Sequence, residues 1–191
     1  MELQQISPET HERILKGELV PRTLDELASL SHAELLKLYS RATVPSEMKA
    51  LDGVLRGRPL AVRGTSSGPI FRAFAALEGS PSFPWEGKTL TAKTATEGVG
   101  VNRVKLPGLG RQQLFPFTTQ FDPSALDGKP CVFIDYDNED NPALIRAIRD
   151  EVREISPGLF FGPVCLKHSG KTTLLLWFGI QRPDAEKRAR A

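Results

Sequence analysis

The segment Leu174–Phe178 reads Leu-Leu-Leu-Trp-Phe and is apolar at every position. Successive residues of a strand face opposite sides of a sheet, so a strand of this kind must be covered on both sides. It is the last of several strand-like runs that follow residue 85. A sheet curled around its own interior, with a helix outside it or across its end, satisfies this pattern. We therefore expect an α+β fold built on a strongly curved antiparallel sheet or barrel.

Alternating apolar and polar residues predict the earlier strands. The predicted strands are residues 88–93, 99–106, 113–121, 131–136, 159–167 and 172–181. In the run 99–106, Asn102 and Val104 share one face and Arg103 lies on the other. In the run 113–121, Pro116 cannot donate a ladder hydrogen bond, so this strand is expected at an edge or to carry a bulge.

Capping signals predict short helices in the first 44 residues. Ser7 precedes a proline, and the segments Thr23–Glu26 and Ser31–Glu34 both match the capping box. Helices this short are marginal alone, so their leucine faces must pack on another part of the chain. A further short helix is predicted at residues 69–77.

The longest predicted helix covers residues 142–155. Asn141 and Pro142 suit its first positions, and Ser156-Pro157-Gly158 suits its end. Its apolar stripe would consist of Leu144, Ile145, Ile148, Val152 and Ile155. We expect this helix to pack on the barrel.

The chain of 191 residues is expected to form one domain, because its helical part has little core of its own. Within it, residues 1–44 are helical, residues 45–182 form the sheet-rich body, and residues 183–191 form a charged, solvated tail. The net charge of +2 gives no general attraction to nucleic acid or membranes. The basic tail leaves a local nucleic-acid contact open. No apolar run approaches the roughly 20 residues of a membrane-spanning helix, and the oligomeric state stays open.

Cys131 and Cys165 lie in apolar strand-like runs. The N-terminal stretch is polar and contains no secretory signal, so a reducing cytoplasmic location is expected. Two buried free thiols are then expected, although a disulfide stays possible if the two strands are neighbours.

Several known sequence motifs are excluded, because the residues they require are absent at the required spacing. Gly170-Lys171-Thr172 lacks the glycine that a phosphate-binding loop needs five residues earlier, where Cys165 stands. The acidic run 135–140 lacks the glycine of a calcium loop, and the three histidines share no ligand spacing. We therefore expect neither a metal nor a cofactor.

Two segments resemble the bacterial GXWXG proteins. They are Gly53-Val-Leu-Arg-Gly57-Arg58 and Trp85-Glu-Gly87-Lys88, with Leu55 where that group has its first tryptophan. The similarity spans roughly residues 48–180 and extends through Phe133–Asp137, Ile148–Asp150 and Leu159–Gly162. It implies a lipocalin-like β-barrel and supplies no catalytic residue. It also implies that Gly53, Gly57, Trp85, Gly87 and Lys88 are structural or line one mouth of the barrel.

Isolated polar residues inside the strand-like runs supply the functional hypothesis. They are Asn102, Arg103, Lys105, Gln113, Asp135 and Tyr136, which either face water or orient a ligand among apolar walls. The leading hypothesis is the binding of a small hydrophobic molecule, a lipid or an apolar metabolite, in the barrel. Its predicted contacts are Trp85, Phe115, Phe117, Phe133 and Trp177, with Arg103 or Tyr136 at its polar end.

Two alternatives stay open. The first is a small-molecule enzyme that uses acid–base chemistry through Asp135, Tyr136 or Arg103, which a carboxylate and a second polar group meeting in one pocket would favour. The second is an interaction module that docks through the helices at 23–41, which a large exposed apolar patch there would favour.

Overall fold

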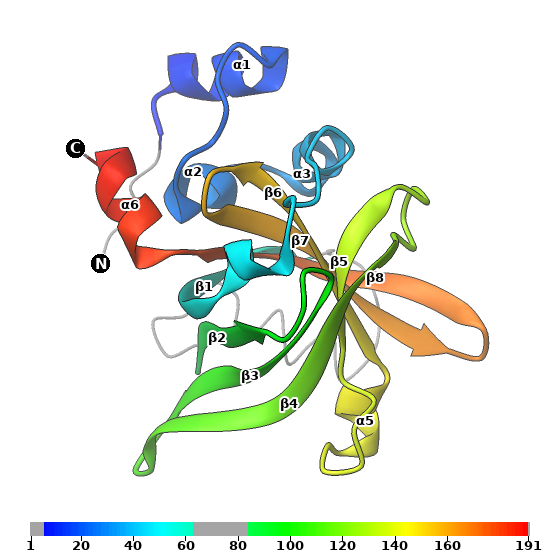
Figure 1. The fold of residues 1–191 in the computed structure, drawn as a ribbon. Coiled ribbons are helices and arrows are strands. Elements are labelled where there is room, and N and C mark those ends of the chain that lie inside the picture. The colour runs from blue at the N-terminus through cyan, green and yellow to red at the C-terminus, as the bar shows by residue number, and fades with distance from the viewer. Residues whose placement is uncertain (1–5, 63–83, 191) are drawn as a thin grey trace.

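A computed structural model describes residues 6–62 and 84–190 and contains a closed antiparallel barrel (Figure 1). Every strand pairs with its neighbour in the chain, and β8 pairs with β1 to close the sheet. The curved antiparallel sheet predicted from the sequence is thereby confirmed. Its strands are β1 (Gly53–Val62), β2 (Trp85–Ala92), β3 (Glu97–Leu106), β4 (Gly110–Pro123), β5 (Pro130–Asp135), β6 (Ile148–Ser156), β7 (Leu159–His168) and β8 (Lys171–Gln181).

Short helices accompany the barrel in the described part of the chain. They are α1 (Pro8–Lys16), α2 (Leu24–Ala28), α3 (His32–Tyr39), the 3₁₀ helix η1 (Met48–Leu51), α5 (Ala143–Arg146) and α6 (Pro183–Arg190). The predicted caps are confirmed: Ser7 caps α1, and both capping boxes are complete, with Thr23 and Glu26 at α2 and Ser31 and Glu34 at α3. None of these helices is long and apolar enough to cross a membrane.

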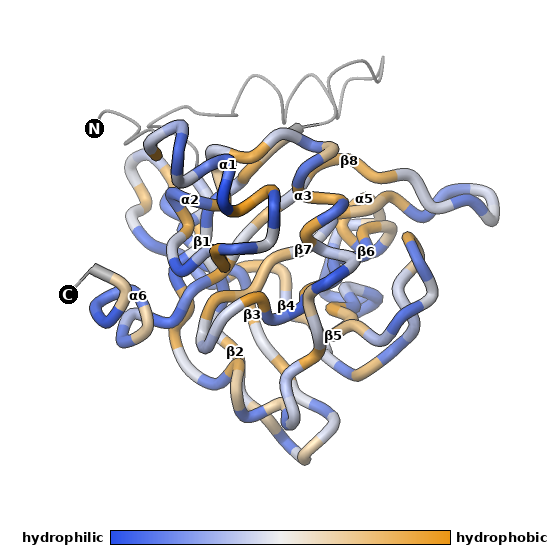
Figure 2. Tube along the Cα trace, turned by 90° about the horizontal axis from the view of Figure 1, so that it is seen from above, coloured by the Kyte–Doolittle hydropathy of each residue, from blue (hydrophilic) through white to orange (hydrophobic). Residues whose placement is uncertain are grey.

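Strand β8 separates two apolar clusters, as its sequence requires. Leu175 and Phe178 lie in the cluster inside the barrel. Leu174 and Trp177 lie in an outer cluster with the buried leucines of α2 and α3. In Figures 1 and 2 these helices gather on one side of the barrel, and Figure 2 shows apolar and polar residues alternating along much of the chain. The outer cover of β8 therefore comes from the N-terminal helices.

The bulge predicted at Pro116 is confirmed in β4. Gly100 of β3 faces Phe117, but Asn102 faces Leu114, so β4 carries one extra residue between these pairs. Phe115 occupies this bulge with a φ of 58°, a left-handed conformation that non-glycine residues rarely adopt. The bulge turns its ring toward the barrel interior.

The predicted helix at 142–155 is wrong. Only α5 is helical there, and Ile148–Ser156 forms β6 between β5 and β7. Spacings of four residues, such as Ile148 to Val152, fit a strand as well as a helix, because four is a multiple of two. Asp150 and Arg153, both buried in β6, bond to distant parts of the chain.

Residues 183–190 of the predicted charged, solvated tail form the helix α6, in which Asp184, Lys187 and Arg188 are exposed. Ala185 is buried, and Glu186 pairs with Arg56 of β1 at 2.6 Å. The two cysteines are free and buried, on β5 and β7 with β6 between them. The predicted helix at 69–77 lies outside the described residues.

Candidate functional site

One end of the barrel contains a cavity of about 230 Å³. It lies in the half where β1 ends and β2 begins. At the opposite end η1 carries Met48 and Leu51 into the interior, where both are at most 1% exposed. The barrel is thus filled at one end and hollow at the other. The cavity is lined by Pro59, Pro84, Trp85, Lys88, Asn102, Val104, Phe115, Tyr136, Ile145, Ile148, Asp150, Val164, Leu176 and Phe178.

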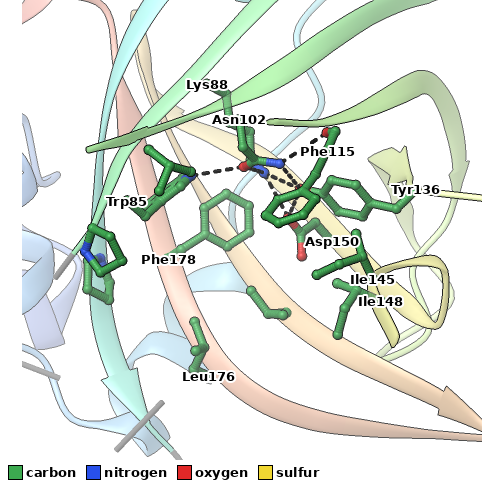
Figure 3. Close-up of a pocket in the computed structure, with 14 residues that line it drawn as sticks. Trp85, Lys88, Asn102, Phe115, Tyr136, Ile145, Ile148, Asp150, Leu176 and Phe178 are labelled. Carbon is green, nitrogen blue, oxygen red and sulfur yellow. Dashed lines mark hydrogen bonds and ion pairs between the residues drawn. The ribbon is translucent and has the colours of Figure 1, made fainter. Parts of the chain in front are cut away.

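A buried polar cluster forms one wall of this cavity (Figure 3). The Lys88 ammonium donates to Asn102 Oδ1 at 3.0 Å, to Asp150 Oδ2 at 2.9 Å and to the Tyr136 hydroxyl. Tyr136 in turn donates to the same Asp150 oxygen at 2.8 Å. The indole N–H of Trp85 donates to Asn102 Oδ1 at 2.9 Å. Strands β2, β3 and β6 and the residue after β5 therefore meet in one network.

Aromatic rings surround the Lys88 ammonium on its other sides. Its nitrogen lies 5.1 to 5.5 Å from the ring centres of Trp85, Phe117, Tyr136 and Phe178. Attraction between a cation and aromatic faces offsets part of the cost of removing the charge from water. Lys88 is only 1% exposed, so these rings and three acceptors replace its entire hydration shell.

Burial shifts the proton equilibria of the cluster. The pKa of Lys88 is lowered because burial penalises its charge, although Asp150 counteracts this effect. The pKa of Tyr136 is raised well above its ordinary value, first by burial and then by the negative charge of Asp150. Three oxygen atoms lie within hydrogen-bond distance of the Lys88 nitrogen, and an ammonium can donate to all three. The geometry therefore fits a lysine–aspartate ion pair beside a protonated tyrosine.

Among the described residues, Asp150 is hydrogen-bonded through one of its two carboxylate oxygens. Oδ2 accepts from Lys88 and Tyr136, whereas the buried Oδ1 accepts no hydrogen bond within the described part of the chain. In Figure 3 this second oxygen points away from Lys88, toward the space between Phe178, Ile148 and Leu176. Unsatisfied buried acceptors are rare and costly, so this atom is a candidate ligand contact.

Glycine allows Trp85 to reach the network. A Cβ at Gly57 would lie 2.5 Å from the Trp85 ring and 2.5 Å from Gly87 Cα. Likewise, a Cβ at Gly100 would lie 2.5 Å from the Phe117 ring. The two aromatic rings thus pack directly against the backbone of these glycines. A larger residue at either position would displace a ring.

The structure brings three of the residues predicted from the sequence to the cavity: Trp85, Phe115 and Tyr136. Phe117 stands just behind this wall, 2% exposed, with its ring 5.4 Å from that of Tyr136. All four residues have inward side chains.

The other three predicted residues lie elsewhere. Arg103 is on the outer face of β3, where it bonds to Leu55 O and pairs with Glu86. Phe133 is on the outer face of β5 under the guanidinium of Arg149, which is 4.1 Å from its ring centre. Trp177 packs under α3 and donates to His32 Nδ1 at 3.0 Å. Each stands one position away from an inward residue, because strand side chains alternate.

Sequence reasoning misses Lys88 and Asp150 as site residues, and it does not include Asn102 among the contacts. It predicts Lys88 only as a structural residue or as part of a barrel mouth, and it places Asp150 on a helix. The signal that could have found Asp150 is the inward series Ile148, Asp150 and Val152, in which one charge interrupts an apolar strand face. Such a buried charge requires a partner of opposite sign.

Fold and cavity together define a closed antiparallel β-barrel with a few short helices, lipocalin-like in general form. No family model matches the chain, and no curated protein is found to be similar to it. A solved structure described as a protein from Thermomonospora curvata is similar with a TM-score of 0.49 and 15% identity. That match covers 91% of this chain and 98% of the other.

Proposed function

We propose that this protein binds a small, largely apolar molecule inside its barrel. The observation that carries the proposal is the cavity of about 230 Å³, whose wall is apolar except for one polar cluster. Binding sites for small molecules commonly combine apolar walls with a few polar groups that fix orientation.

The size of the cavity limits the ligand. Its volume equals roughly that of seven or eight water molecules in the liquid. A single ring or a short branched chain fits this space, whereas a long-chain lipid is too large to be enclosed in it. Within the predicted class of hydrophobic ligands, we therefore favour a small apolar metabolite over a lipid.

The resemblance to the GXWXG group fits this proposal. Trp85 and Lys88 of the Trp-x-Gly-Lys segment line the cavity, and Gly57 supports the Trp85 ring. These motif residues would then shape the ligand site of that group. The two free buried thiols fit the expected reducing cytoplasm.

A protein-observed NMR titration with phenol and toluene tests the proposal. We expect at least one of these one-ring probes to shift the signals of Ile148 and Leu176, both of which line the cavity. A dissociation constant of about 1 mM requires only about −4 kcal/mol, well within the range of ligands this small.

Two matched variants locate the binding. Val104→Phe places a ring in the cavity, whereas Val99→Phe adds the same ring to the same strand at a position 37% exposed on its outer face. We expect Val104→Phe to abolish binding and Val99→Phe to preserve it. If neither probe binds the wild-type protein, or if both variants bind equally, the proposal fails.

An acid–base enzyme is a second candidate. What supports it is the meeting of a carboxylate and a phenol, Asp150 and Tyr136, in one cavity. Of these two, only Tyr136 is among the residues that the sequence suggests for this chemistry. Asp150 Oδ1, which has no hydrogen-bond partner among the described residues, could accept a proton from a bound molecule. The donors of Lys88 and Tyr136 are already committed within the cluster, which favours binding over proton donation.

Hydrogen exchange separates these two candidates. Incubation with cyclohexanone in D₂O would show accelerated exchange at the carbons beside the carbonyl if Asp150 acts as a base. Asp150→Asn should then abolish the acceleration. Exchange at the rate of buffer alone, with phenol or toluene still binding, would support the binding function.

The N-terminal helices offer no support for an interaction module. Among the large apolar side chains of α2 and α3, both fully described, only Leu36 is exposed, at 44%. The remaining leucines of these helices are buried against the outer face of the barrel.

A further inference from the structure

Resting on the proposed binding function, we infer that the ligand is a neutral molecule with a hydroxyl or N–H group that donates a hydrogen bond to Asp150 Oδ1. The class we propose is a small alcohol or phenol, and it excludes carboxylates and other anions. Two properties of the site select this class: which of its polar atoms are already bonded, and how its charges balance.

The hydrogen-bond donors of the cluster are already bonded to other groups of the protein. Lys88 uses its three N–H groups on Asn102, Tyr136 and Asp150. Tyr136 uses its single O–H on Asp150, and Trp85 uses its N–H on Asn102. The Asn102 amide donates to Tyr136 at 3.2 Å and to Phe115 O at 3.4 Å. A ligand that needs a donor, such as a carboxylate, would have to break one of these bonds.

One hydrogen-bond acceptor of the cluster, Asp150 Oδ1, is not used within the described part of the protein. Asp150 Oδ1 is buried, lacks a hydrogen-bond partner among the described residues, and belongs to a side chain that is 6% exposed. The cavity around it is lined by Ile145, Ile148, Leu176 and other apolar side chains. A water molecule there would find few further partners, whereas it needs about three hydrogen bonds to be held well. A ligand with one donor and an apolar body matches this surface better.

The charge of the site favours a neutral ligand. Lys88 and Asp150 already balance each other, with their charged atoms 2.9 Å apart. An anion or a cation would therefore add an uncompensated charge to an apolar cavity, which is costly. A neutral hydroxyl meets the carboxylate oxygen without changing the net charge.

Three one-ring probes test the inference: phenol and toluene, which have nearly the same shape, and the slightly larger anion benzoate. Each is titrated against the wild-type protein near pH 7. We expect phenol to bind about tenfold tighter than toluene, which corresponds to about 1.4 kcal/mol for the extra hydrogen bond. Benzoate should bind at least tenfold more weakly than phenol. Contacts from the probe to Ile148 and Leu176, seen as intermolecular NOEs, would place it in the cavity.

Asp150→Asn reverses the polarity of the free position. The asparagine oxygen is needed by Lys88 and Tyr136, so its NH₂ would face the cavity. We expect the preference for phenol over toluene to fall to about threefold or less, whereas Val99→Phe should keep the wild-type preference. Because the wild-type measurements stand alone, the inference stays testable even if Asp150→Asn does not fold.

The outcomes separate this inference from the function on which it rests. If none of the three probes binds in the cavity, the proposed function itself fails. If toluene binds as tightly as phenol, or benzoate binds best, the cavity is a binding site but its ligand is not a neutral donor, and the inference is overturned.

Discussion

At the residue scale, Lys88 is the side chain whose burial inside the barrel most needs compensating contacts, because it carries a charge. Its ammonium is removed from water and held by three acceptors and four aromatic rings. Asp150 lies beside it as the paired charge, with Oδ2 2.9 Å from the Lys88 nitrogen. Removing one charge would leave the other buried and unpaired, which costs more than removing both.

Lys88→Met should lower the free energy of unfolding by about 3–5 kcal/mol, because the Asp150 carboxylate loses its counter-charge. The double variant Lys88→Met/Asp150→Leu should recover part of this loss. Urea unfolding followed by circular dichroism measures both values. A loss below about 1 kcal/mol in the single variant would mean that the pair contributes little.

The two buried thiols predict an alkaline loss of stability. Burial, followed by the negative charge of Glu151, raises the pKa of Cys131 and of Cys165 from 9.0 to about 12. Between these values the unfolded chain loses thiol protons that the folded protein retains. The stability contribution of each thiol is therefore complete below pH 9 and is lost as the pH rises toward 12.

Comparison with Cys131→Ala/Cys165→Ala isolates this effect from other groups that titrate at alkaline pH. The double variant should have a lower free energy of unfolding than the wild type near pH 8. This difference in free energy should decrease steadily as the pH rises above the ordinary thiol pKa of 9.0. Reversible urea unfolding at a series of pH values, with a reductant present, measures it. A difference that stays constant would contradict the raised pKa values.

At the element scale, β6 stands out because it carries buried charged residues on both of its faces. Asp150 points into the barrel, whereas Glu151 and Arg153 point outward under α3. Arg153 donates to Asp127 through both terminal nitrogens, at 2.9 and 2.7 Å. It also donates to Tyr39 O, Lys129 O and Pro130 O. One side chain thereby ties α3 and the β4–β5 loop to the sheet.

Arg153→Met should therefore destabilise the fold by about 3–5 kcal/mol, because it leaves buried carbonyls and Asp127 without their donor. The matched control is Arg146→Met. Arg146 pairs with Asp137 on the surface and is 42% exposed, so its loss should cost about 0–1 kcal/mol. Thermal and urea unfolding of both variants measure the contrast, and equal costs would refute the structural role of Arg153.

At the scale of the whole molecule, the N-terminal helices complete the barrel. The outer faces of β7 and β8 present Phe161, Trp177 and Leu174 to α2 and α3. Without these helices, a broad apolar face would meet water, which favours association. We propose on this basis that residues 1–41 and the barrel unfold together as one domain.

Deletion of residues 1–41 should therefore abolish cooperative folding or cause aggregation, with exposure of Trp177 reported by a red shift in fluorescence. Deletion of residues 1–16 is the control, because Ile14 is the buried residue that α1 contributes. We expect that shorter chain to unfold in a single transition, as the full chain should. A stable, monomeric barrel lacking residues 1–41 would show that the helices are dispensable.

Strand alternation sets how much of the site could be predicted from the sequence. It correctly grouped Asn102 with Val104, because local register fixes which residues share a face. Phe115 also shares the inner face with Phe117, as grouped, but there the bulge turns its ring inward. Alternation could not say which face is the inside. Phe133 and Trp177 are as apolar as Phe117, yet both lie on the outer face of the sheet. There Trp177 packs in the cluster beneath the N-terminal helices, and Phe133 packs under the guanidinium of Arg149.

The sequence by itself determined most of the strands, the caps of the short helices, the bulge at Pro116 and the curved sheet, because each depends on neighbouring residues or on simple periodicity. Only the tertiary structure decided that residues 148–156 form a strand and that Lys88 and Asp150 meet in the cavity. Those two residues are 62 positions apart. A buried charge is stable only beside its partner, and folding, not local propensity, brings that partner into contact.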